Sequence, residues 1–184
     1  MSILRTNQIT DTAGTGTPSF PNGLAGTSGV GKVLQVKQAI SNTASSSFNS
    51  RTFTDIPGMT IAITPTSTSS NILISTSLSW GCNSYPYAGV IIQRNGSNII
   101  VGPVTSSGET KATFGLQGVT DAYRLMCTHY QLLDTEVSTT SEVTYKLQWS
   151  TNVELYLNRV HNLQSGNANT MSGVSTITAM EIGG

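Results

Sequence analysis

A period of two in the placement of apolar residues is the feature that most constrains this fold. Every second residue from Ile72 to Trp80 is Ile, Thr, Leu or Trp, and the residues between them are one leucine and three serines. Side chains of a β-strand point alternately to opposite faces of a sheet, whereas the faces of a helix repeat about every 3.6 residues. The pattern therefore predicts a strand that buries one of its faces.

Further segments rich in Val, Ile, Thr and Tyr are predicted strands, because Pro, Gly, Asn and Ser separate them. Asn95-Gly96 predicts a hairpin with a type I′ turn, since both turn positions need positive φ. Residues 150–152 are predicted to form a second hairpin, and residues 56–58 are interpreted as a break between strands. The further predicted strands are 33–40, 51–55, 59–64, 90–94, 97–101, 110–116, 122–133, 143–149, 153–158 and 172–182.

These segments together predict an all-β fold, and in particular a jelly-roll-like antiparallel β-sandwich. A closed up-and-down barrel is the alternative architecture. The sequence has no internal repeat and no helical stripe longer than about two turns, which argues against a solenoid and a helical bundle. We assign residues 32–184 to this head domain.

The polarity of the chain comes from hydroxyl groups more than from charge. There are 24 serines, 27 threonines and 18 glycines, while charged residues make up 10% of the chain and sum to a formal net charge of zero. Nothing in this balance would neutralise nucleic-acid phosphates or anionic lipid, so we expect neither partner. No apolar run approaches the roughly 20 residues of a membrane span, and the first 20 residues lack the pattern of a signal peptide.

Residues 1–31 differ from the rest and are interpreted as an extended anchoring arm that ends in a glycine hinge. Their few large apolar side chains stand among Thr, Gly, Asn and Pro, so the segment cannot build a core of its own. A disordered terminus is the alternative interpretation. The candidate anchoring residues, expected to dock on another protein, are Ile3, Leu4, Ile9 and Phe20.

Two patterns that suggest chemistry are not supported by their context. Residues 26–32 have the Gly and Lys spacing of a phosphate-binding loop, but Val33 stands where that loop needs Ser or Thr, and the chain continues as a strand. Cys82 and Cys127 lack the further ligands of a zinc site. We predict that they are small buried residues rather than a disulfide.

Catalysis is not expected from the histidines or the carboxylates. His129 and His161 are not accompanied by the Gly-x-Ser-x-Gly motif of a serine hydrolase. The acidic residues form no close pair on one strand face of the kind that cleaves glycosidic bonds, which makes a polysaccharide-cleaving enzyme the less favoured alternative. We expect a protein that is not an enzyme and that holds no cofactor and no metal.

Two features suggest contacts with other molecules. Tyr85 and Tyr87 lie in a polar loop, and either stack on sugar rings or pack against a neighbouring chain. The strand predicted at 172–182 carries apolar residues on both faces. Such a strand is covered on both sides, either within the fold or by another subunit.

Several stretches of this sequence resemble small virion proteins of tailed phages, especially phages that infect cyanobacteria. The resemblance spans nearly the whole chain, and its motifs are structural rather than catalytic. The matching stretches are Ser2–Gly14, Pro18–Gly23, Phe53–Met59, Thr64–Ile74, Thr144–Gln148 and Ser175–Ile182.

The resemblance implies a homotrimer with a jelly-roll head, held on the virion by its N-terminal arm and assembled in the host cytoplasm. Its expected partners are copies of itself and other proteins of the capsid or tail, with a host surface glycan as a further partner. Family members include tail fibres and other appendages. The chain lacks a long shaft, so a capsid decoration protein and a receptor-binding carbohydrate module of the tail are the alternatives.

Overall fold

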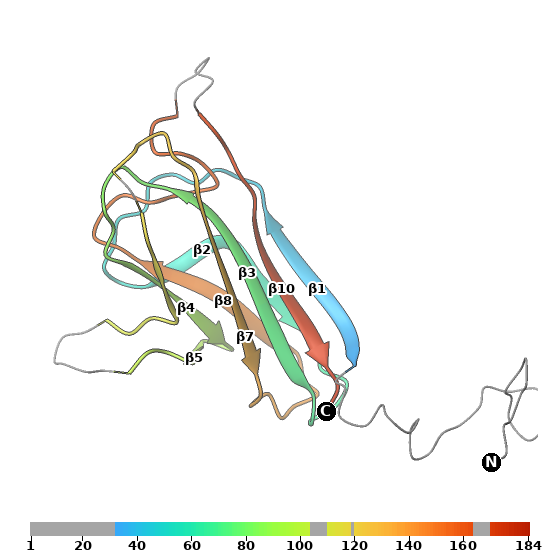
Figure 1. The fold of residues 1–184 in the computed structure, drawn as a ribbon. Helices are drawn as coiled ribbons and strands as arrows, with labels where there is room; N and C mark the ends of the chain where they lie inside the picture. Colours follow the sequence, from blue (N-terminus) through green and yellow to red (C-terminus); the bar gives the residue numbers. More distant parts are fainter. Residues whose placement is uncertain (1–31, 104–109, 119, 164–169) are drawn as a thin grey trace, which may run out of the picture. The chain divides into compact units, whose positions relative to one another are not determined.

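The computed structural model describes residues 32–103, 110–118, 120–163 and 170–184 (Figure 1). Within these ranges the regular secondary structure is entirely β-strand, as the all-β prediction requires. The strands are β1 (Val33–Ser41), β2 (Thr54–Ile63), β3 (Asn71–Gly81), β4 (Ala88–Arg94), β5 (Ser97–Ile99), β6 (Phe114–Leu116), β7 (Met126–Asp134), β8 (Val143–Ser150), β9 (Tyr156–Leu157) and β10 (Ser175–Ile182).

The strands form two antiparallel sheets. Sheet I has the order β1-β10-β3-β7, with β9 paired to β3, and sheet II has the order β2-β8-β4-β5, with β6 paired to β4. Strands β1 to β4 alternate between the two sheets, and β7, β8 and β10 continue that alternation. Two open sheets replace the closed barrel that was the alternative architecture.

The core lies between the sheets, and the period of two in β3 places its residues there. Ile74, Leu78 and Trp80 are each 1% exposed or less, while the intervening residue Leu73 is only half-buried. From sheet II, Tyr145 and its neighbours at every second position of β8 enter the same core. The prediction of a strand with one buried face is confirmed.

The predicted break at residues 56–58 is wrong, because this segment lies inside β2. The pairing of β2 with β8 shifts register between Asp55 and Thr60, where the chain forms a bulge and Gly58 adopts a φ of 74°. The bulge turns both Ile56 and Met59 into the core. Its proline is tolerated because β2 is an edge strand.

The hairpin predicted at Asn95-Gly96 is confirmed. Asn95 and Gly96 have φ values of 50° and 83°, and Arg94 pairs with Ser97 on the other side of the turn. The asparagine side chain also accepts a 2.9 Å hydrogen bond from the backbone N–H of Thr144 on β8. This contact fixes the turn against the neighbouring strand.

The hairpin predicted at residues 150–152 is wrong, because β8 and β9 belong to different sheets. β8 pairs with β2 and β4 in sheet II, whereas β9 pairs with β3 through Trp80 and Leu157 in sheet I. Both strands show the same alternation because each presents apolar residues to the one shared core. Alternation identifies the buried face but not the sheet.

The last strand, β10, is central in sheet I, between β1 and β3. Its inward residues Ile177 and Ala179 are completely buried, whereas Met180 and Ile182 on the other face are half-buried. Of the two alternatives left open by the sequence, the structure shows the central position within a sheet. The outer face of β10 has no complete cover from the described part of this chain. The division of the chain at residue 31 stays a prediction.

Candidate functional site

A pocket of about 320 Å³ lies on the outer face of sheet II. Its floor is a row of three small residues on neighbouring strands, because Gly89 of β4 pairs with Gly115 of β6 on one side and with Ser150 of β8 on the other. Adjacent positions of the same strands face the core, so these three face outward. Missing side chains in one cross-strand row create the hollow.

The segment before β6 forms one wall of this pocket. A Cβ atom added to Gly89 would lie 2.7 Å from Cβ of Ala112, a distance that real Cβ atoms essentially never show. A Cβ atom added to Gly115 would lie 3.7 Å from the nearest atom, a backbone carbonyl oxygen, which is an ordinary contact. Glycine at position 89 is therefore required for the close approach of the wall, whereas position 115 is open.

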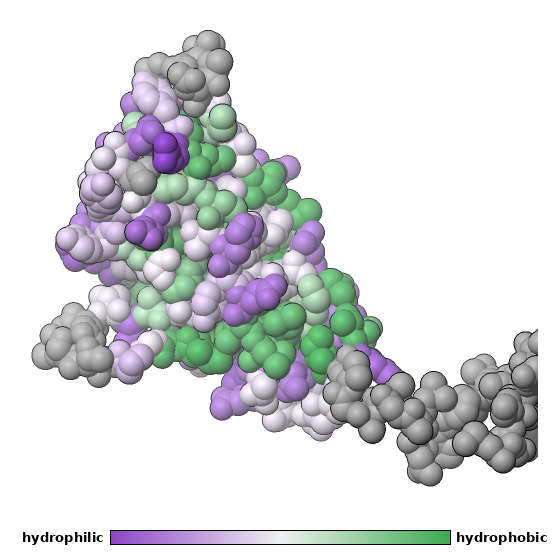
Figure 2. Space-filling view, viewed as in Figure 1, coloured by the Kyte–Doolittle hydropathy of each residue, from purple (hydrophilic) through white to green (hydrophobic). Residues whose placement is uncertain are grey.

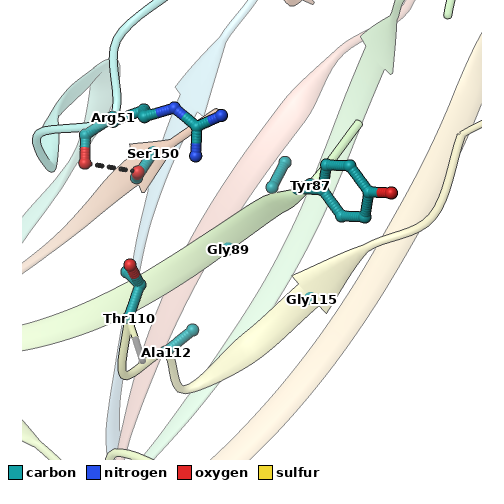
Figure 3. A pocket seen from close by; sticks show the side chains of 8 residues that line it. Arg51, Tyr87, Gly89, Thr110, Ala112, Gly115 and Ser150 are labelled. Carbon is teal, nitrogen blue, oxygen red and sulfur yellow. Dashed lines mark hydrogen bonds between the residues drawn. The ribbon is translucent and has the colours of Figure 1, made fainter. Parts of the chain in front are cut away.

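Arg51 and Tyr87 line the pocket together with Thr110 (Figure 3). The backbone carbonyl of Arg51 accepts a 2.8 Å hydrogen bond from the Ser150 hydroxyl, which ties this segment to the pocket floor. The backbone N–H of Tyr87 donates a 2.7 Å hydrogen bond to the side chain of Asn152. The main chain of both residues is thus held, and their side chains are exposed.

The two tyrosines singled out in the sequence occupy different surroundings. Tyr87 is 83% exposed and lines the pocket, whereas Tyr85 is 67% exposed and is not among the lining residues. Sequence reasoning therefore found one pocket residue but missed Arg51 and the floor. The sequence signal that could have indicated the pocket floor is the glycine in each of two strand segments, Gly89 and Gly115. A glycine inside a strand often marks a place where another backbone or a ligand approaches closely.

The outer face of sheet I is a second candidate surface. None of the twelve residues in its three cross-strand rows is Asp, Glu, Lys or Arg. We call it the uncharged face. By contrast, the outer face of sheet II carries Lys146 of β8, paired at 2.9 Å with Asp55 of β2. The rows of the uncharged face are Val36–Met180–Leu73–Leu133, Gln38–Thr178–Ser75–Gln131 and Ile40–Thr176–Ser77–His129.

The first of these rows is apolar along its whole length and crosses all four long strands. Val36 on the edge strand β1 is 55% exposed and Leu133 on β7 is 44% exposed, with Met180 and Leu73 half-buried between them. Figure 2 shows hydrophobic residues gathered on this face where β10 and β7 end and β1 begins. An exposed apolar row on an uncharged sheet face is typical of a protein interface.

One cysteine and one histidine, Cys127 and His129, share strand β7, whereas Cys82 and His161 lie elsewhere. Cys82 is buried as predicted, but the predicted burial of Cys127 is wrong, because this residue lies on the outer face of β7. Its Sγ atom is 3.4 Å from Nε2 of His129, two positions along the strand. His161 follows β9, where Nε2 lies 3.3 Å from a carboxylate oxygen of Glu154. No disulfide joins the two cysteines.

Glu181 is a completely buried carboxylate at the end of β10. It accepts hydrogen bonds of 2.6 Å from Nε2 of Gln35 and of 2.7 Å from both the backbone N–H and the hydroxyl of Thr66. Burial acts to raise the pKa of Glu181, but the hydrogen bonds of the charged form outweigh it and lower the pKa to about 2. The carboxylate thereby fixes β1 and the segment after β2.

Comparison with protein-family models and with curated proteins found no match to this chain. Among the described residues, no three His, Cys, Asp or Glu side chains gather in a way that could hold a metal ion. No helix in the same ranges has the length and hydropathy to cross a membrane. The candidate anchoring residues Ile3, Leu4, Ile9 and Phe20 lie outside the described residues.

Proposed function

We propose that this chain is a non-enzymatic structural protein of a tailed-phage particle. It is a homotrimer with a jelly-roll head, and residues 1–31 attach it to the virion. Support for the phage assignment comes from the sequence resemblance, which spans both the arm and the head. Support for a permanent protein neighbour comes from the uncharged face, and this observation carries the proposal.

The occupant of the uncharged face is a second copy of the chain. Two kinds of observation favour this over a charged partner. The three rows of this face contain no Asp, Glu, Lys or Arg, and the whole chain has a formal net charge of zero, so copies do not repel one another. Val36, Met180, Leu73 and Leu133 then leave water together, which contributes several kcal/mol per interface before ordering costs.

The edge strand β1 is the second support for self-association. It is nine residues long and exposes Val33, Leu34, Val36 and Ile40. Long apolar edge strands are templates for unwanted pairing, and proteins usually cover them. In the proposed trimer, the next chain around the axis covers this edge and the apolar row beside it.

The strand order supports a jelly roll among the β-sandwich folds. β10 lies between β1 and β3, and β8 lies between β2 and β4, so late strands pair with early ones in both sheets. A Greek key produces this arrangement when a returning strand pairs beside the first, and a jelly roll contains two of them.

The arm attaches the head through sparse apolar side chains. The large hydrophobes of these 31 residues are too few for a core, but the four candidate anchoring residues are enough to fill a preformed groove on another virion protein. Three arms on one trimer bind together, so that release requires all three to detach.

Particle incorporation tests this function. We expect the full chain in density-purified particles, and we expect a variant that lacks residues 1–23 to remain a folded trimer that is absent from them. Changing Ile3, Leu4, Ile9 and Phe20 to Ser in the full-length chain should have the same effect. Incorporation of either variant at the wild-type level would contradict the anchoring role, and absence of the full chain would contradict the assignment to the virion.

Capsid decoration is a variant of the same proposal that differs in the position of the chain on the particle. An image of an intact particle in which this chain is placed in density distinguishes a capsid position from a tail position. The receptor-binding alternative is favoured by one specific observation, the pocket that contains Tyr87. That pocket supports a more definite inference.

A further inference from the structure

We propose that the pocket on sheet II binds one sugar ring that carries a carboxylate. In this arrangement the ring stacks on Tyr87, the carboxylate pairs with Arg51, and the glycine floor admits the flat body of the sugar. The pocket lies on the opposite sheet from the uncharged face, so this inference is independent of the proposed trimer.

Tyr87 supplies a stacking surface whose position is fixed by its main chain. The ring is 83% exposed, while the backbone N–H is bonded to Asn152 on the connection after β8. An aromatic ring offers a large apolar face at little cost in conformational entropy, because its side chain has few rotatable bonds. The apolar face of a pyranose, lined by C–H groups, matches such a ring.

The floor sets the size and shape of the ligand. Gly115, Gly89 and Ser150 form one continuous row with no side chain larger than a hydroxymethyl group, so a flat body can lie against the sheet. The volume of about 320 Å³ stands at the lower end of the roughly 300 to 1,000 Å³ of small-molecule sites. The pocket therefore fits a single ring rather than a long saccharide.

Arg51 sets the charge of the ligand. Among the described residues that line the pocket, it is the one charged side chain, and none of the others is Asp or Glu. Its guanidinium forms no ion pair with any residue in the described ranges. A planar guanidinium binds a carboxylate through two parallel hydrogen bonds, and the hydroxyls of Thr110 and Ser150 add partners for sugar hydroxyls.

A sugar acid accounts for these features better than a simple anion does. Inorganic phosphate would use Arg51 alone and would leave the tyrosine ring without a partner. A neutral sugar would use Tyr87 and the hydroxyls but would leave the guanidinium unpaired. A ligand with both a C–H face and a carboxylate uses all of them.

Titration of the full-length chain with matched ligands tests the proposal. Methyl β-glucuronide and methyl β-glucoside differ only at C6, where the first has a carboxylate and the second a hydroxymethyl group, and calorimetry or NMR shifts measure both affinities. We expect the glucuronide to bind about tenfold more tightly, because a charge-assisted hydrogen-bonded pair contributes roughly that much. Inorganic phosphate, as a third titrant, should bind more weakly than the glucuronide.

Three variants separate the roles of the side chains. Arg51→Gln should bring the glucuronide affinity down to that of the glucoside, whereas Tyr87→Ala should weaken both about tenfold. Tyr85→Ala is the matched control, because Tyr85 is also exposed but does not line the pocket, and it should change neither affinity. A Cβ atom added at Gly115 meets only an ordinary contact with the Ala88 carbonyl oxygen, so Gly115→Leu should be accommodated and should block both sugars.

Several outcomes would overturn the proposal. Equal affinity for the two glycosides would remove the role of Arg51, and phosphate binding as tight as glucuronide binding would make the site a simple anion site. Equal losses in Tyr85→Ala and Tyr87→Ala would remove the stacking role. If neither glycoside binds, the pocket is not a site for a sugar acid and the proposal is wrong. None of these results would affect particle incorporation or the trimer.

Discussion

The hydroxyl of Tyr145 on β8 donates a 2.7 Å hydrogen bond to Oδ2 of Asp134, the last residue of β7, so that a buried contact joins the two sheets. Nη1 of Arg94 on β4 lies 2.7 and 2.9 Å from the two oxygens of the same carboxylate. Burial raises the pKa of Tyr145 well above its usual range, and the hydrogen bond to Asp134 adds to the rise. The three side chains form one polar cluster between the sheets.

Removing a member of this cluster should destabilise the fold. The loss of stability should be larger when a charged side chain is left without a partner than when one neutral hydrogen bond is lost. Asp134→Asn leaves Arg94 without its charge partner and should lower the free energy of unfolding by about 3 kcal/mol. Tyr145→Phe deletes one hydrogen bond and should cost about 1 to 2 kcal/mol. Urea denaturation measures both. Tyr130→Phe is the control and should cost less than about 0.5 kcal/mol, and an equal effect in this variant would contradict the account.

The raised pKa of Tyr145 also predicts a limit on stability at alkaline pH. Because the folded state holds this phenol neutral, its contribution is fully present below the unfolded-state pKa of 10.0 and is lost as pH rises above that value. A spectroscopic titration should show tyrosinate absorbance from Tyr145 only when the chain unfolds. Tyr145→Phe should remove this late component, and its persistence in the variant would assign it to another tyrosine.

Glu181 predicts the opposite dependence at acid pH. Its folded-state pKa of about 2 lies below the ordinary value of 4.5, so its contribution is present above 4.5 and declines as pH falls toward 2. Glu181→Gln should lower the free energy of unfolding at neutral pH by about 2 kcal/mol and should make the acid decline shallower. The exposed residue Glu142 gives the control Glu142→Gln. An unchanged acid decline in Glu181→Gln would show that other carboxylates cause it.

The two glycines of the pocket floor, Gly89 and Gly115, should respond differently to replacement by alanine, because only Gly89 is in close contact with the pocket wall. Gly89→Ala forces the new methyl group against Ala112 and should destabilise the fold by about 1 to 3 kcal/mol. Gly115→Ala meets no such neighbour and should change stability by less than about 0.5 kcal/mol. Denaturation curves of the two variants test the difference, and equal effects would mean that the wall moves freely.

The uncharged face gives a prediction about assembly. A charge introduced by Val36→Glu lies in the interface of the proposed trimer without a partner, so the variant should be monomeric and still folded. Ile100→Glu is the matched control, because Ile100 is similarly exposed, at 58% against 55%, but lies outside this face. Light scattering and circular dichroism report mass and fold. A trimer that persists in Val36→Glu would place the interface elsewhere.

Local signals in the sequence predicted the local structure of this fold. The alternation in Ile72 to Trp80 identified a half-buried strand, and Asn95-Gly96 identified a hairpin, because each depends on residues that are close in the chain. The exposed position of Tyr87 was also consistent with its polar loop. Such features need no knowledge of distant partners.

Features that depend on distant pairing were missed or misplaced. The strands on either side of residues 150–152 enter one core from two sheets, and alternation is the same in either case. The bulge at Gly58 keeps Ile56 and Met59 on one face, which a strict period of two does not foresee. The pocket arises because β6, β4 and β8 place small residues in one row, and that row exists only once the register is known.

The mass of the full-length chain in solution tests the central claim most directly. Native mass spectrometry and light scattering at micromolar concentration should give three times the 19.4 kDa of one chain, with the uncharged face protected from amide and side-chain labelling. A folded chain that remains at 19.4 kDa, with Val36, Leu133 and their neighbours open to labelling, would contradict the account.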